Sequence, residues 1–203
     1  MAEQSSSSKV VFWSATTIVV LLPLYIWADF LSWNFMRVNF STVFPLLGLL
    51  AYSILWLQML VVSVLRSLPT GFRNNFFFIS GLVFLLLIIA HPLLLSISQS
   101  QINQTIVDYV GDTRKIFITL ALTAWLIYIL YEIFSKFKKW RYFRNSMKVF
   151  KYLNYVAFYL IFFHSINLGT HLQGGILVFI WYFYAVSGLL FIYLDIKRHK
   201  KLT

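Results

Sequence analysis

Residues 76–97 read FFFISGLVFLLLIIAHPLLLSI, a run in which His91 is the only ionisable side chain. A helix needs roughly 20 mainly apolar residues to cross about 30 Å of hydrocarbon, so this run predicts a membrane-spanning α-helix. Five other stretches of the sequence meet the same requirement. We therefore predict an all-α, polytopic membrane protein whose six-helix bundle occupies residues 10–28, 44–65, 76–97, 116–134, 149–168 and 175–194.

The composition agrees with this class, because 60% of the 203 residues are hydrophobic and only 11% are charged. We expect a short polar N-terminus (1–9), a transmembrane domain (10–194) and a basic tail (195–203). The first apolar run is too long for a secretory signal, which predicts a retained first helix. Little chain is left for a flavin or nucleotide domain. Cysteine is absent, which excludes disulfides, iron–sulfur clusters and thioether-linked haem.

The net charge of +11 is explained by topology better than by nucleic-acid binding. Basic residues gather in alternate loops, as the positive-inside rule predicts for cytoplasmic segments. All loops agree on both termini being cytoplasmic. We expect an integral, multi-pass protein of a bacterial inner membrane or a plasma membrane. The basic positions are Arg66, Arg73, Lys136, Lys138, Lys139, Arg141, Arg144, Lys148, Lys197, Arg198, Lys200 and Lys201.

Two histidines fall at matched depth in this topology. His91 and His164 each lie about fifteen residues into their helices, about 22 Å from the cytoplasmic end, and those helices run parallel. An ionisable side chain within the hydrocarbon indicates a functional site. One haem iron could take both imidazoles as axial ligands, which favours electron transfer. The alternative is a pair of interfacial histidines hydrogen-bonded to backbone carbonyls or lipid headgroups.

Two segments resemble the ferric reductase-like transmembrane domain, which occurs in ferric reductases, NADPH oxidases and the haem-binding subunit of the methionine-sulfoxide reductase system. They are MKVFKYLNYVAFYLIFFHSINLG, residues 147–169, and the run quoted above. The resemblance implies that His91 and His164 bind a b-type haem in the outer half of the bilayer. The family's inner ligands would fall at Phe77 or Phe78 and at Lys151, so the inner haem is expected to be missing.

Several further polar residues are candidates for a functional or structural role. His171 is either a group close to the haem or a solvated loop histidine, and Gln58 is either a link between helices or a contact to a haem propionate or quinone. Lys151 is expected to snorkel toward the cytoplasmic boundary. Asn39 and Asn103 begin glycosylation sequons. We predict local ion pairs from Glu132 to Lys136 and from Asp195 to Arg198 or His199.

These residues predict a membrane haem protein that transfers electrons through one haem b held by His91 and His164. It would be a possible oxidoreductase subunit without its own flavin domain. The basic segment Lys136–Lys148 could then dock a soluble flavin reductase. Two other functions stay open: a haem-free scaffold or assembly subunit, and a small transporter with a polar path through His91, His164 and Gln58.

Overall fold

The computed structural model describes residues 2–136 and 141–199, with side chains for residues 7–106, 108–131, 133–134 and 149–198. Within those ranges the chain is built from α-helices and three short 3-10 turns, Phe35–Arg37, Asp112–Arg114 and Thr170–Leu172. The helices are α1 (Ala2–Phe30), α2 (Phe40–Ser63), α3 (Thr70–Ser100), α4 (Ile106–Val110), α5 (Lys115–Lys136), α6 (Arg141–Leu168) and α7 (Ile176–His199).

Six of the described helices are long and apolar enough to cross a membrane, which confirms the predicted set. The candidate spans are Ser7–Phe30, Phe40–Ser63, Thr70–Ser100, Asp112–Tyr131, Val149–Leu168 and Ile176–Arg198. Several helices extend beyond the predicted limits, because hydrophobicity marks the hydrocarbon layer and not the helix end. For α2, Asn39 and Thr42 form a capping box, so the helix begins before the predicted residue 44.

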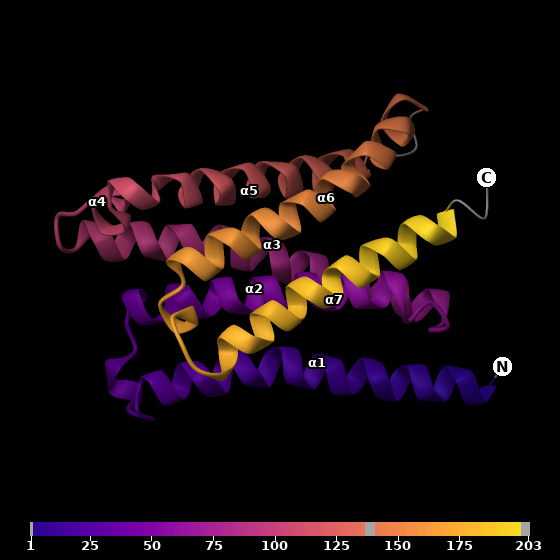
Figure 1. The fold of residues 1–203 in the computed structure, drawn as a ribbon, viewed down its shortest axis with the longest axis horizontal. Helices are drawn as coiled ribbons and strands as arrows, with labels where there is room; N and C mark the ends of the chain where they lie inside the picture. The colour runs from indigo at the N-terminus through magenta and orange to yellow at the C-terminus, as the bar shows by residue number, and fades with distance from the viewer. Residues whose placement is uncertain (1, 137–140, 200–203) are drawn as a thin grey trace.

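The bundle is organised as two antiparallel hairpins with α2 at its centre (Figure 1). Helices α2 and α3 form one hairpin and α5 and α6 the other, while α2 also contacts α1, α6 and α7. In Figure 1, α7 runs obliquely across the bundle and both ends of the chain lie at the same end of it. We call this the terminal end and the opposite one, beside α4, the α4 end.

Aromatic side chains fill the region where α2, α6 and α7 meet. Tyr52 stacks on Phe158 with ring centroids 4.8 Å apart, and Trp56 stacks on Tyr184 at 4.6 Å. Trp181 is completely buried beside them. The outward faces of α3 and α7 are instead lined with exposed large apolar side chains, as a surface that contacts lipid requires. Lipid is as apolar as these side chains, so the hydrophobic effect does not drive the helices together. Dispersion contacts between the rings therefore stabilise their packing.

The small helix α4 was not predicted, because its five residues are too short to show a period. It begins where Asp108 accepts hydrogen bonds from the backbone N–H and the hydroxyl of Thr105, at 3.0 and 2.6 Å. These bonds favour the carboxylate and lower the pKa of Asp108. A capped turn thus lies at the α4 end, between α3 and α5.

Candidate functional site

His91 is fixed in its orientation by α2. Its Nδ1 lies 2.6 Å from the backbone carbonyl oxygen of Phe44. The imidazole lies against Gly48, where an added Cβ would be only 3.0 Å from His91 Cε1. Glycine at this position therefore allows the ring to pack directly on the backbone of α2. Pro92 follows within α3 and cannot donate a hydrogen bond to the carbonyl of Ile88 one turn earlier.

His164 repeats the arrangement in the second hairpin. Its Nδ1 lies 2.9 Å from the backbone carbonyl oxygen of Phe117 on α5. In both hairpins the histidine is on the second helix, the carbonyl is on the first, and 47 residues separate them. The two hairpins are thus tied in the same way, although their sequences show no obvious repeat.

His91 and His164 lie on α3 and α6, one in each hairpin, and their joint binding of one haem stays a prediction. A carbonyl oxygen only accepts hydrogen bonds, which means that Nδ1 carries the proton in each neutral ring. The lone pair is then on Nε2, the atom used by a histidine that binds a metal. The arrangement supplies two Nε2 donors from two separate hairpins.

Other metal chemistry has less support. Among the residues with described side chains, no group of three or more histidine, cysteine or acidic residues is placed to hold a metal ion. A haem iron, by contrast, needs only two protein ligands because the porphyrin supplies the other four. The donor set of two histidines therefore suits a haem better than a bare metal ion.

A cavity of about 590 Å³ lies between the two hairpins, nearer the terminal end than the histidines. Ile88, one turn before His91, belongs to its lining, but neither histidine does. Phe77, Phe78 and Lys151 also line it. These are the residues at the positions where the resemblance would place the inner haem ligands, so those positions face one cavity. The volume is typical of a small-molecule site.

Gln58 lines this cavity and has a simple structural role. Its side-chain amide donates a hydrogen bond to Ser80 Oγ at 3.0 Å, which links α2 to α3. The interpretation of Gln58 as a link between helices is confirmed. Its place in the cavity, away from the histidine rings, gives no support to a direct role beside them.

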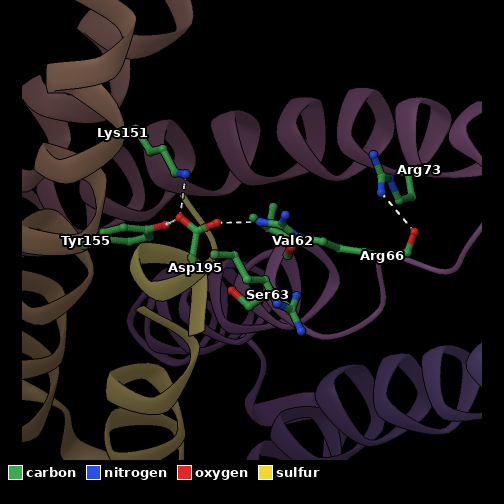
Figure 2. A network of polar contacts seen from close by, with 8 residues as sticks. Val62, Ser63, Arg66, Arg73, Lys151, Tyr155 and Asp195 are labelled. Atoms are coloured by element: carbon green, nitrogen blue, oxygen red, sulfur yellow. Dashed lines mark hydrogen bonds and ion pairs between the residues drawn. The ribbon is translucent and has the colours of Figure 1, made fainter. Parts of the chain in front are cut away.

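Asp195 differs most from its prediction. We expected a local pair with Arg198 or His199, but the carboxylate is 1% exposed and binds three side chains from other parts of the bundle (Figure 2). Arg66 Nη2 lies 2.6 Å from Oδ1, Lys151 Nζ lies 2.5 Å from Oδ2, and the hydroxyl of Tyr155 donates to Oδ2 at 2.6 Å.

Burial explains why Asp195 has these partners. A buried carboxylate is stable only when cations and hydrogen-bond donors surround it, and here the turn after α2 and helix α6 supply them. Arg198 turns elsewhere and donates to the backbone carbonyl of Ser63 at 2.5 Å. Lys151, expected to snorkel toward the cytoplasmic boundary, forms an ion pair with Asp195 that links α6 to α7. The side chain of His199 lies outside the described residues.

His171 lies in the turn between α6 and α7 and contacts α1 instead of the histidine pair. Its ring meets Phe30 edge to face with centroids 4.4 Å apart. Its Nε2 is buried and has no hydrogen-bond partner within the described structure. Burial lowers the pKa of His171, which keeps the ring neutral.

Two other groups of predictions remain open. The side chains of Glu132 and of the basic segment from Lys136 to Lys148 lie outside the described residues, so their proposed ion pair and docking role are not addressed. Asn39 caps α2 by accepting from the backbone N–H of Thr42 at 3.1 Å. Asn103 is exposed and has a left-handed backbone, φ 53°.

Comparison with known proteins adds nothing to this geometry, since no protein-family model, curated protein or solved structure matches the chain.

Proposed function

We propose that this multi-pass membrane protein binds one b-type haem through His91 and His164 and transfers single electrons in the half of the bilayer near α4. The observation that carries the proposal is the matched pair of hydrogen bonds from Nδ1 to a backbone carbonyl, 2.6 Å at His91 and 2.9 Å at His164. Histidines that bind metals commonly make this bond with the nitrogen that does not face the metal.

Each part of the arrangement has a chemical effect. The carbonyls of Phe44 and Phe117 fix the rings in one tautomer and increase the basicity of Nε2. His91 and His164 would hold a haem through their Nε2 atoms, and the haem would supply one-electron redox chemistry. Ligation by two imidazoles would favour electron transfer over oxygen binding.

Space for a flat macrocycle would have to come from the interface between the hairpins. Helix α3 makes hardly any backbone contact with α5 or α6 in the described structure, whereas each hairpin is closely packed internally. The cavity between them already reaches Ile88, one turn from His91. A small separation of the hairpins near the histidines would therefore join that space to the Nε2 atoms.

The predicted topology indicates on which side of the membrane the proposed site lies. The positive-inside rule places the terminal end, with Arg66, Arg73 and Lys197, in the cytoplasm. The histidines then belong to the outer half of a bacterial inner membrane or a plasma membrane. The chain would act as a subunit that receives electrons from a separate donor, for which a soluble flavin reductase at Lys136–Lys148 is the proposed partner.

The haem-free scaffold is the competing function, and the same two hydrogen bonds favour it. They tie α2 to α3 and α5 to α6 without any metal, so the histidines would have a purely structural role. The two functions make opposite predictions about haem content, which can be measured directly.

The test is the haem content of the detergent-purified full chain, expressed with added haem and measured as the pyridine haemochrome. We expect about one haem b per chain in the wild type, since His91 and His164 supply one pair of imidazoles, and a large loss in His91→Ala and His164→Ala. His171→Ala is the matched control and should keep its haem. A monodisperse wild-type protein without haem would support the scaffold and refute the haem site.

A further inference from the structure

The cavity between the hairpins has an apolar wall and a polar end. Leu55 and Met59 of α2 and Phe84 and Leu85 of α3 contribute to the wall. Lys151, Asn154 and Tyr155 of α6, together with Ser63 at the end of α2, form the polar end, while Gln58, Tyr128 and Tyr131 add single polar groups elsewhere in the lining. A cavity divided in this way matches an amphiphile, because the tail and the head of such a molecule need different surroundings.

The cavity also reaches the surface that faces lipid. Phe78 lines it and is itself 76% exposed on α3. The lining includes Phe78 of α3 and Tyr131 of α5, so the cavity extends between the two hairpins. A molecule already dissolved in the bilayer therefore has a lateral route into the cavity.

The charge at the polar end favours an anionic head. Lys151 and Arg66 both bind the carboxylate of Asp195 (Figure 2). Arg198 donates a hydrogen bond to the backbone carbonyl of Ser63, another residue of the lining. The sequence has six acidic residues, and three of them lie at the α4 end: Asp29 in the last turn of α1, Asp108 in α4 and Asp112 in the 3-10 turn that follows. Basic residues are therefore in excess around this end of the cavity.

One buried polar atom in the lining lacks a hydrogen-bond partner among the described residues. The Oδ1 atom of Asn154 is buried and has no hydrogen-bond partner in the described structure. A buried carbonyl oxygen without a donor is costly, so a ligand with a hydroxyl group would satisfy it. A glycerol headgroup carries such a hydroxyl beside its phosphate.

We infer that the cavity binds one anionic phospholipid of the surrounding bilayer. An acyl chain lies between the hairpins along Met59 and Leu85, and the phosphate lies at Lys151. Basic pockets between transmembrane helices on the cytoplasmic side bind anionic headgroups for the same electrostatic reason. The lipid would fill the space between the hairpins and hold them together at the terminal end, whether or not haem is bound near α4.

The test uses the full chain purified in mild detergent, incubated with phosphatidylglycerol or phosphatidylcholine, and analysed by native mass spectrometry. The wild type is expected to retain one phosphatidylglycerol, with a preference of about fivefold or more over phosphatidylcholine. Lys151→Gln should reduce this preference by about fivefold, the effect of one cation near the headgroup. Lys197→Gln removes a charge from the same end but outside the cavity, and should retain the lipid as the wild type does.

A second pair of variants tests the tail without changing charge. Leu85→Trp fills the cavity, whereas Leu86→Trp places the same ring at a neighbouring position that is 60% exposed to lipid. Retention should fall only in Leu85→Trp, and this result does not depend on whether Lys151→Gln folds. Equal retention of the two lipids by the wild type, or equal retention by the two tryptophan variants, would overturn the inference.

Discussion

The ammonium group of Lys151 on α6 lies 2.5 Å from the carboxylate of Asp195 on α7, so two helices are joined by an ion pair whose acid is fully buried. Arg66 and Tyr155 complete the shell around the same carboxylate. This group of four side chains connects the turn after α2 to α6 and α7 at the terminal end.

Asp195→Asn should destabilise the fold strongly. Removing one partner of a buried ion pair costs about 3–5 kcal/mol, and the lower end applies here because Arg66 and Lys151 are partly exposed. A thermal-unfolding assay in detergent should show a clear fall in melting temperature. Asp112→Asn is the matched control: its carboxylate is 87% exposed in a pair with Lys115, so little change is expected. Similar melting temperatures for both variants would show that the buried cluster contributes little.

Gly48→Val should displace the imidazole of His91. Even the Cβ of alanine at this position would lie 3.0 Å from Cε1, and the branched side chain is larger still. Overpacking of this kind costs about 1–3 kcal/mol and would weaken the bond to the Phe44 carbonyl. Haem retention and the melting temperature should both fall. Gly174→Val is the control, because nothing lies within 4 Å of a Cβ there, and it should leave haem retention unchanged.

The stability of the protein should fall as the pH drops below about 6.5, the ordinary pKa of histidine. Burial lowers the pKa of His171 in the folded state, so between that lowered value and 6.5 the unfolded chain binds more protons. By linkage, acid therefore favours unfolding in this window, and the stabilisation is complete only above it. Melting temperatures at pH 7 and pH 5 measure the effect. His171→Phe should reduce the difference, and an unchanged difference would contradict the assignment.

Gln58→Leu should have a small effect on stability and none on haem. Hydrogen bonds between transmembrane helices average about 0.6 kcal/mol, and Gln58 makes one to Ser80. A double-mutant cycle with Ser80→Ala isolates that energy, because either single change removes the same bond. Loss of haem in Gln58→Leu alone would show that this side chain contacts the cofactor, contrary to its position in the structure.

Local sequence predicted the helices well and the polar contacts poorly. An apolar run such as residues 76–97 needs no partner to be recognised, because the hydrocarbon sets its length. The partners of Asp195 were missed because Arg66 is 129 residues away in the sequence, whereas the rule for helical ion pairs looks only three or four residues ahead. Burial of the carboxylate, which decided the outcome, is not visible in a single sequence.

Less can be said of the site. The matched depth of His91 and His164 follows from helix length and topology, and their role as ligands of one haem stays a prediction. Their carbonyl partners, Phe44 and Phe117, were not predicted as specific acceptors, because every residue has a backbone carbonyl and the sequence does not distinguish one from another. Gly48 was a possible signal, because a glycine within an apolar helix often marks a close contact.

The most direct test of the central proposal is the electron paramagnetic resonance spectrum of the oxidised, haem-loaded full chain, compared with His91→Ala and His164→Ala. If both Nε2 atoms bind the same iron, the wild type should give a low-spin signal of two axial imidazoles. Each single variant should lose the haem or change to a high-spin form with one histidine. A low-spin signal that survives in either variant, or a folded wild type that binds no haem, would contradict ligation by His91 and His164.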